Sequence, residues 1–279
     1  MEEYDSAKDS VASYYAAVEA KRVAGWDAVK RDVTIGDCRL LLGDCAKIAP
    51  LLQPVDAIIA DPPYLLSSTS PGTNHCFGKS LKKFDSSDYK DIVEGFDYET
   101  LFPELEKICR PFNLFCFCSN KQISQIMSYH ESRSRVTTLL VWHKTNAAPF
   151  ANGVWRGDIE YCVHARDNGA VFLGNAEEKK KVSEHPIVVD ASHPTVKPLS
   201  IIQKYVRICS NPGQTILDPF MGSGTTGAAC VKLGRKFVGI EISEDHFETA
   251  VKRITDAYNR PDMFIETARV PEPVQEAML

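Results

Sequence analysis

Hydrophobic and polar positions follow two alternating patterns along the chain. Short apolar runs, such as residues 55–60 and 113–118, are typical of strands that are buried on both faces of a parallel sheet. Between such runs, apolar residues recur at helical spacing, as in residues 98–110, where Leu101 and Leu105 share one face. The alternation of strands and helices predicts an α/β fold with a mostly parallel sheet.

The same patterns place the remaining elements. Further strands are expected at residues 33–37, 39–45, 136–144, 159–165, 214–218 and 236–240. Further helices are expected at residues 46–52, 122–130, 199–209, 228–233 and 245–258. Residues 1–32 are expected to form a helical extension, residues 65–90 a long loop of the functional or disordered kind, and residues 261–279 a loosely ordered tail. The chain is therefore interpreted as one domain over residues 33–260.

The composition is that of a globular protein without a membrane anchor. Of the 279 residues, 44% are hydrophobic and 25% are charged, which is ordinary for such proteins. No stretch approaches the ~20 apolar residues of a membrane span, and the acidic amino terminus lacks the basic and apolar regions of a signal peptide. The nine cysteines form no CxxC pair and predict buried reduced thiols rather than a metal site. We therefore expect a cytoplasmic protein.

The charge balance bears on nucleic-acid binding. A formal net charge of −5 argues mildly against a general nucleic-acid coat protein but leaves room for a local basic face. The candidate cations for such a face are Lys79, Lys82, Lys83, Lys144 and Arg156. Clusters of this kind are more often solvated surface than a binding site.

The stretch Asp61-Pro62-Pro63-Tyr64 follows one of the predicted buried strands. Each proline fixes φ and removes a backbone N–H donor, so the turn is rigid, rich in acceptors and poor in donors. The Asp61 carboxylate can only accept hydrogen bonds once ionised, and Tyr64 adds a flat aromatic face. Together these groups suit a planar ligand that carries an exocyclic amino group. Taken alone, the same four residues also fit a simple strand-ending turn.

A second candidate site begins at Asp218, where another predicted strand ends. Gly222, Gly224 and Gly227 fit the pattern G-x-G-x-x-G, and Glu241 ends the next strand. Such glycines allow a tight turn and close backbone approach, and the acid can accept hydrogen bonds from ribose hydroxyls. The pattern therefore predicts a site for an adenosine-type cofactor. NAD fits it, and so does a cofactor whose cationic amino group lies against Asp218; a P-loop is excluded because no Gly-Lys-Ser/Thr follows.

Three spaced motifs together resemble the DNA amino-methyltransferases. They are Asp61-Pro62-Pro63-Tyr64, His193-Pro194-x-x-Lys197-Pro198 and Asp218-Pro219-Phe220-x-Gly222-Ser223-Gly224-Thr225-Thr226. Their order is similar to that of the permuted beta group, in which the catalytic motif precedes the cofactor motif. The resemblance covers residues 33–258 and includes Trp142-His143-Lys144-x-Asn146.

The resemblance implies a Rossmann-like methyltransferase fold with a seven-stranded, mostly parallel sheet, in which the strands of the two main motifs are neighbours. It implies S-adenosylmethionine as methyl donor, with Glu241 on the ribose hydroxyls, Asp44 near the adenine and Lys197 near the methionine carboxylate. The cofactor site that it implies comprises Asp44, Asp61, Lys197, Asp218, Phe220, Gly222, Ser223, Gly224, Thr225 and Glu241. It further implies a homodimer that acts on double-stranded DNA in a bacterial or phage-infected cell, with restriction-associated relatives and only a short target-recognition insert at residues 145–192.

The expected reaction is methylation of an exocyclic base amine. Asp61 and the Pro62 carbonyl would accept the amine N–H groups, Pro63 would hold them rigidly, and Tyr64 would stack on a flipped base. The resemblance favours adenine N6 over cytosine N4, because an acid rather than serine opens the motif, as is usual in the adenine-modifying members. Cytosine or RNA as substrate, an NAD-dependent oxidoreductase and a non-catalytic DNA-binding protein remain as alternatives.

Overall fold

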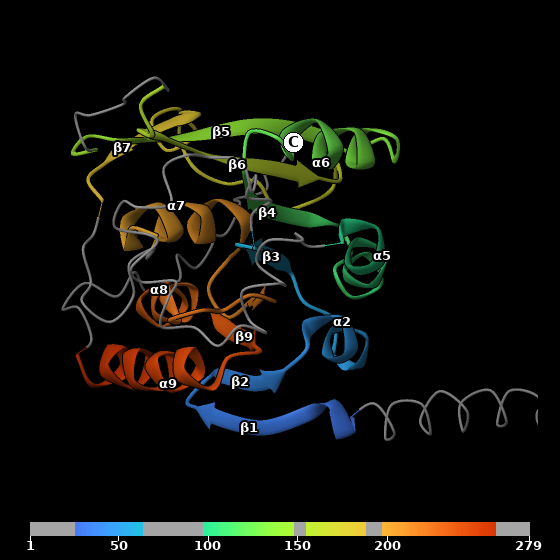
Figure 1. Cartoon of the computed structure of the whole chain (residues 1–279), viewed down its shortest axis with the longest axis vertical. Coiled ribbons are helices and arrows are strands. Elements are labelled where there is room, and N and C mark those ends of the chain that lie inside the picture. Colours follow the sequence, from blue (N-terminus) through green and yellow to red (C-terminus); the bar gives the residue numbers. More distant parts are fainter. Residues whose placement is uncertain (1–25, 64–96, 148–154, 188–196, 261–279) are drawn as a thin grey trace, which may run out of the picture.

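The computed structural model describes residues 26–63, 97–147, 155–187 and 197–260 (Figure 1). The helices are η1 (Trp26–Ala28), α2 (Cys45–Ile48), η2 (Ala49–Leu51), α5 (Tyr98–Ile108), α6 (Ile123–Glu131), α7 (Leu199–Cys209), α8 (Thr225–Leu233) and α9 (Glu244–Asn259). The strands are β1 (Val29–Ile35), β2 (Cys38–Gly43), β3 (Ala57–Ala60), β4 (Asn113–Cys118), β5 (Val136–Lys144), β6 (Ile159–Arg166), β7 (Val182–His185), β8 (Thr215–Asp218) and β9 (Lys236–Glu241).

One sheet connects all the strands of the described residues, in the order β1-β2-β9-β8-β3-β4-β6-β5-β7. The neighbours β2, β9, β8, β3 and β4 are parallel, whereas β1 and β6 run antiparallel to the strands beside them. β5 and β7 are again parallel to each other. The carboxyl ends of seven strands and the amino ends of β1 and β6 therefore lie along the same edge of the sheet.

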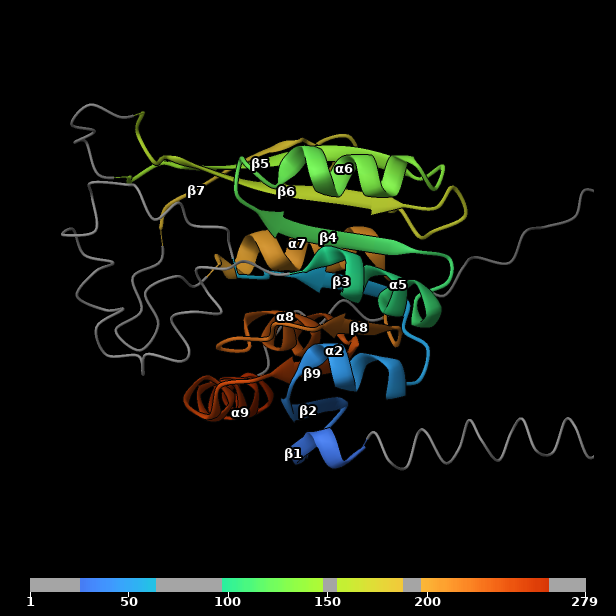
Figure 2. The ribbon, with the colours of Figure 1, turned by 45° about the vertical axis from the view of Figure 1, so that its right-hand side comes forward.

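Helices cover the sheet on both faces, as Figures 1 and 2 show. One core lies under α7, α8 and α9, and the other lies under α2, α5 and α6. Alternate residues of each central strand enter opposite cores; in β3, for example, Ile59 faces the first and Ile58 the second. This period of two explains the continuous apolar runs, because a strand covered on both faces has no polar side.

The fold confirms the predicted α/β class and most element positions, with three corrections. The described part of the sheet has nine strands, not seven, because β1 and β7 extend its two ends. β1 begins at Val29, so the last residues of the segment 1–32 are strand rather than helix. α8 begins at Thr225, three positions before the predicted start, because Gly224 caps it in a left-handed conformation.

The segment 145–192, expected to be an insert, contributes two strands to the sheet. β6 lies between β4 and β5, pairing with β5 over residues 159–166 and with β4 over residues 161–166, and β7 is the edge strand beside β5. Residues 148–154 and 188–192 lie outside the described residues, as do 1–25, 64–96 and 261–279. In the part of the chain that the structure describes, no helix has the length and apolar character needed to span a bilayer.

Candidate active site

Four acidic residues lie at the carboxyl ends of four neighbouring strands. In the order of the sheet they are Asp44 after β2, Glu241 in β9, Asp218 in β8 and Asp61 after β3. β3 and β8 are direct neighbours, as the resemblance implied. The chain leaves β3 toward β4 and leaves β8 toward β9, in opposite directions across the sheet. This reversal is the type of crevice in which open α/β sheets bind their ligands.

The glycine loop between β8 and α8 has the backbone conformation that its sequence predicts. Gly222 has φ of +51° and Gly224 has φ of +81°, both in the region that favours glycine. Glu241 holds this loop, because its Oε2 accepts a hydrogen bond from the Gly222 N–H at 2.7 Å. Its Oε1 accepts from the Ser243 N–H at 2.9 Å. The acid is thereby fixed at the mouth of the loop with both oxygens oriented.

Arg253 of α9 is a loop contact that the sequence motifs did not indicate. Its Nη1 donates to Ser223 Oγ at 2.6 Å and to Thr225 Oγ1 at 3.0 Å. In this structure, both hydroxyls predicted to bind cofactor point toward Arg253. Their proposed role at a cofactor stays a prediction, and Arg253 is assigned to holding the loop against α9.

Asp218 is buried beneath the same loop and is only 4% exposed. Thr226 Oγ1 donates to its Oδ2 at 2.6 Å, and the Phe220 N–H donates to its Oδ1 at 3.0 Å. Burial raises the pKa of this carboxyl to about 7, and these two hydrogen bonds only partly offset the effect. In the ligand-free protein, burial disfavours the ionised form of Asp218. A cation placed against this carboxyl would therefore stabilise its ionised form.

The other side of this crevice offers an apolar surface next to the acids. Ile242 directly follows Glu241 and is 63% exposed, which is high for a large aliphatic side chain. Phe220 is half-buried against the core under α2. Asp44 caps the amino terminus of α2 by accepting from the Ala46 N–H at 3.0 Å. The motifs missed Ile242; its signal in the sequence is an isolated isoleucine after a strand-ending acid.

Asp61 belongs to an ion-pair network that reaches across the sheet. Its Oδ2 lies 2.6 Å from Lys197 Nζ, and this ammonium lies 3.3 Å from Glu160 Oε2. Glu160 Oε1 in turn lies 2.7 Å from Lys144 Nζ. Lys197 Nζ also lies 5.0 Å from the centre of the Phe117 ring. The sequence predicted functions for Asp61, Lys144 and Lys197 but not for Glu160, the residue that joins the two lysines.

Burial and the neighbouring charges shift the pKa values of this network in opposite directions. Burial alone lowers the pKa of Lys197, but Asp61 and Glu160 outweigh it, so that its pKa is raised. Burial likewise favours the neutral form of Glu160, but Lys197 and Lys144 outweigh it and lower the pKa of this carboxyl. Lys197 and Glu160 are thus both charged near neutral pH, within a largely buried site.

The described residues test the predicted DNA contacts only in part. The Lys144 side chain is 16% exposed and is engaged with Glu160, so a contact with DNA stays a prediction. Arg156 donates to the backbone carbonyl of Ala147, and the neighbouring Trp155 is 98% exposed. The other predicted DNA contacts, Lys79, Lys82 and Lys83, lie outside the described residues. So do the predicted stacking residue Tyr64 and the motif residues His193 and Pro194. Pro62 is buried behind Asp61, and Pro63 is half-buried.

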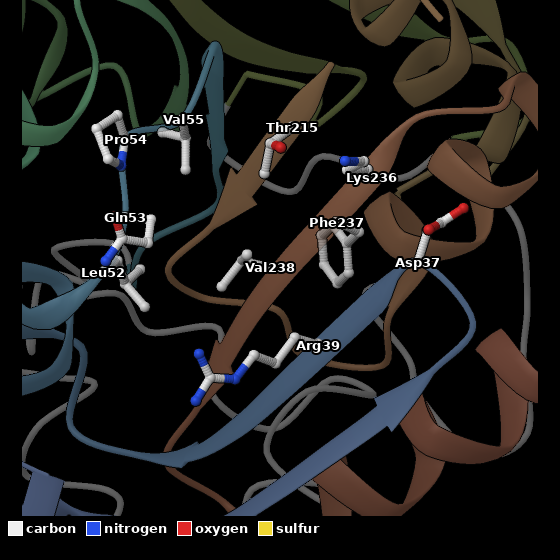
Figure 3. Close-up of a pocket in the computed structure, with 10 residues that line it drawn as sticks. All are labelled: Asp37, Arg39, Leu52, Gln53, Pro54, Val55, Thr215, Lys236, Phe237 and Val238. Atoms are coloured by element: carbon white, nitrogen blue, oxygen red, sulfur yellow. The ribbon is translucent and has the colours of Figure 1, made fainter. Parts of the chain in front are cut away.

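A separate cavity of about 230 Å³ opens at the opposite edge of the sheet (Figure 3). It lies where β2, β8 and β9 begin, and its lining includes Arg39, Thr215 and Lys236. The Arg39 guanidinium is engaged with Asp32 at 2.6 Å. The cavity is remote from the acids at the carboxyl edge, so it takes no part in the candidate site.

Comparison with known proteins identifies the family. The sequence profile of the DNA methylase family, which groups N6 and N4 methyltransferases, matches residues 55–252. The chain belongs to this family. The matched region includes Asp61, the glycine loop and Glu241, so the main residues of the candidate site lie within the part of the chain that defines it as a DNA methyltransferase.

Two curated relatives align with most of this methyltransferase. It is 27% identical over 237 residues to type II methyltransferase M2.LlaDCHI of Lactococcus lactis subsp. cremoris, covering 77% of this chain and 88% of that protein. It is 26% identical over 237 residues to type II methyltransferase M2.DpnII of Streptococcus pneumoniae, with the same coverage of both chains.

Solved structures agree in fold. The crystal structure of an M1.HpyAVI–SAM complex superposes with a TM-score of 0.59 at 29% identity, covering 78% of this chain and 98% of that one. PvuII DNA methyltransferase, described as cytosine-N4-specific, superposes with a TM-score of 0.56 at 14% identity, covering 83% of this chain and 95% of that one. The second likeness concerns the fold alone.

Proposed function

We propose that this DNA methyltransferase transfers a methyl group from S-adenosylmethionine to the N6 amino group of adenine in double-stranded DNA. The observation that carries the proposal is the position of Asp61 at the end of β3, directly beside the glycine-loop strand β8. An acceptor for the base amine and a cofactor loop are thereby held at one crevice. S-adenosylmethionine, present in the crystallised relative M1.HpyAVI, supplies an electrophilic methyl group when bound.

The residues at the crevice fit this cofactor by their chemistry. Glu241 is a fixed acid suited to the ribose hydroxyls, and the exposed Ile242 is an apolar surface suited to the adenine. Asp218 is a buried carboxyl suited to the ammonium of the methionine part. By the resemblance of the motifs, Phe220, Gly222, Ser223, Gly224 and Thr225 would complete the site, with Asp44 near the adenine.

Asp61 and Pro62 are assigned to the transfer step. An exocyclic base amine is a poor nucleophile because its lone pair is delocalised into the ring. The Asp61 carboxylate and the Pro62 carbonyl each accept one amine N–H, which favours a tetrahedral nitrogen and stabilises the positive charge that develops on it. Fixed acceptors need no reorganisation during the reaction, and Pro62 and Pro63 supply that rigidity.

The resemblance supports adenine over cytosine as the target, because an acid usually opens this motif in the adenine-modifying members. An extruded base would stack on Tyr64, and stacking of about 1–3 kcal/mol is comparable to the cost of base flipping. The two type II relatives support a restriction–modification setting.

We also propose that the enzyme is a homodimer. Light scattering that finds a monomer at concentrations where the enzyme is active would contradict this proposal.

The direct test measures transfer of labelled methyl groups from S-adenosylmethionine to unmethylated genomic DNA, followed by mass spectrometry of the nucleosides. N6-methyladenine supports the proposal, whereas N4-methylcytosine keeps the mechanism and corrects the base. Parallel reactions with duplex DNA and RNA oligonucleotides of the same sequence separate the two kinds of substrate. Absence of product on DNA, with cofactor shown to bind, contradicts the proposal.

Asp61→Ala gives the first mutational prediction. We expect methyl transfer to be lost while the affinity for S-adenosylmethionine, measured by calorimetry, stays within about threefold, because the variant keeps Glu241 and Asp218. Asp32→Ala is the matched control, since that acid lies in the edge strand β1 and pairs with Arg39 on the surface. Near-normal turnover of Asp61→Ala would remove Asp61 from the mechanism.

A further inference from the structure

Four charged side chains of alternating sign form a continuous chain at the carboxyl edge of the sheet. Asp61 follows β3, Lys197 precedes α7, Glu160 lies at the start of β6 and Lys144 ends β5. The successive contacts are 2.6 Å, 3.3 Å and 2.7 Å long. Four separate segments of the chain therefore converge on one electrostatic unit that contains the proposed catalytic acid.

The inner members of this unit are well shielded from water. The Lys197 side chain is 9% exposed and that of Glu160 is 21% exposed, whereas Asp61 is 33% exposed. Breaking a buried ion pair by removing one partner is strongly destabilising, because it leaves a charge without compensation. The arrangement is thus a fixed scaffold with its most accessible charge, Asp61, at the crevice.

We infer that Glu160, acting through Lys197, positions Asp61 and keeps the group around it net negative for methyl transfer. The inference rests on the proposed function and assigns to Glu160 a role that no sequence motif indicates. Glu160 is a positioning residue, because its ion pairs among the described residues are with Lys197 and Lys144.

The net charge around Asp61 explains why a second acid, Glu160, is needed beside Lys197. Lys197 paired with Asp61 alone would form a neutral pair, which presents little net negative charge to a nitrogen that becomes positive. Glu160 shares the same ammonium, so Asp61, Lys197 and Glu160 together carry one net negative charge. Lys144 balances Glu160 on the side away from Asp61, where its effect on the crevice is smaller because of the greater distance.

The same contacts control orientation. Lys197 Nζ holds Asp61 Oδ2, and it is itself held between two carboxylates above the Phe117 ring. Fixing one oxygen of a carboxylate fixes the direction of the other. In a poorly solvated site, an acceptor oriented in advance stabilises developing charge more effectively than one that must reorganise.

This role for Lys197 differs from a contact with the methionine carboxylate of the cofactor, and the two make different predictions. A residue that acts on Asp61 affects the rate of transfer while leaving cofactor affinity largely intact. A residue that holds the cofactor carboxylate affects its dissociation constant. Measuring turnover and binding separately on Glu160 variants distinguishes them, because Glu160 would act on the cofactor only through Lys197.

The experiment compares Glu160→Gln, Glu160→Asp and the control Glu184→Gln. Glu184 lies on β7 at the same end of the sheet and pairs with His143 at 3.2 Å, outside the Asp61 network. Turnover is measured in single-turnover methylation of duplex DNA, cofactor affinity by calorimetry and folding by thermal unfolding. The aspartate variant keeps the charge and serves as the conservative rescue.

We expect Glu160→Gln to lower the single-turnover rate about tenfold, less than the roughly 10²–10³-fold typical of losing a directly acting group. Its affinity for S-adenosylmethionine should stay within about threefold of the wild type. Glu160→Asp should recover part of the rate, and Glu184→Gln should match the wild type. An unchanged rate in a folded Glu160→Gln protein overturns the inference, as does a loss of cofactor affinity equal to the loss of rate.

Failure of the inference and failure of the proposed function give different results. If the wild type itself transfers no methyl group to DNA, the proposed function fails. If the wild type is active and the Glu160 variants are equally active, only the inference fails. Should Glu160→Gln not fold, the double variant Glu160→Gln/Lys144→Met removes both charges of the outer pair and leaves no buried charge without a partner. An unchanged rate in this folded variant overturns the inference, and a loss of rate with cofactor affinity retained supports it.

Discussion

Gly224, at the junction of the cofactor loop and α8, offers a quantitative test of the site's architecture. It caps the helix with φ of +81° and ψ of +24°. A Cβ atom added there would lie 2.9 Å from both Cα and Cβ of Ala250, in α9. Gly224→Ala therefore combines two separate penalties. One is a left-handed backbone conformation in a residue with a side chain, and the other is a collision with Ala250 atoms that no side-chain rotation can move away.

A second glycine of the same helix separates the two penalties. Gly234 ends α8 with φ of +67° and ψ of +35°, and a Cβ atom there meets nothing within 4 Å. Gly234→Ala should cost about 1–2 kcal/mol from backbone strain alone. Gly224→Ala should cost the same plus about 1–3 kcal/mol for overpacking. The difference between the variants measures the contact between the loop and α9.

Urea unfolding gives the free energies, and calorimetry gives the affinity for S-adenosylmethionine. We expect Gly224→Ala to be the less stable variant and to bind cofactor at least about tenfold more weakly. A displaced loop that costs about 1.4 kcal/mol of binding free energy is enough for that change. Gly234→Ala should bind normally, since it lies at the far end of the helix. Equal losses of stability, within about 0.5 kcal/mol, would refute the close packing of Gly224 against α9.

Two further predictions concern the same half of the site. Asp218 has a pKa of 3.8 in the unfolded chain and about 7 in the folded protein, so the folded state binds more protons between these values and stability falls as the pH rises through them. Melting temperatures of the cofactor-free protein from pH 5 to 8 should show this slope, and Asp218→Asn should reduce it; an unchanged slope would contradict the burial of an ionisable group there. Arg253→Met should weaken binding of S-adenosylmethionine about fivefold, because each lost hydrogen bond to Ser223 and Thr225 is worth about 0.5–1.5 kcal/mol. Lys252→Met, on the exposed face of the same helix, is its control, and equal affinities of the two variants would show that Arg253 does not order the loop.

The sequence was most informative where the spacing of apolar residues alone decides whether a segment forms a strand or a helix. The apolar run before Asp61 and the run before Asp218 both form strands buried on two faces, and the motifs at their ends meet because β3 and β8 pair. The helix at residues 199–209 has the predicted bounds, since its apolar face repeats at helical spacing up to the final residue.

Features that depend on three-dimensional proximity could not be predicted in this way. Nothing in the spacing of Glu160, Lys144 and Lys197 states that they meet, because β5 and β6 are antiparallel and Lys197 arrives from a distant segment. Arg253 resembles any cation on an amphipathic helix until Ser223 and Thr225 are placed beside it. The edge strands β1 and β7 also carried weaker signals, because their partly exposed patterns lack the continuous apolar run of a central strand.

One feature of the sequence did indicate a special role for Glu160, and the direction of its strand explains how this acid reaches the edge of the sheet that carries Asp61 and Asp218. A glutamate near the start of the largely buried strand β6 conflicts with burial unless cations compensate it. β6 is antiparallel to β4, so its amino end lies at the edge where the parallel strands have their carboxyl ends. Reversing one strand therefore brings an acid to the catalytic edge from the opposite chain direction. A parallel strand would present its last residues there, as β3 and β8 do, whereas β6 presents its first.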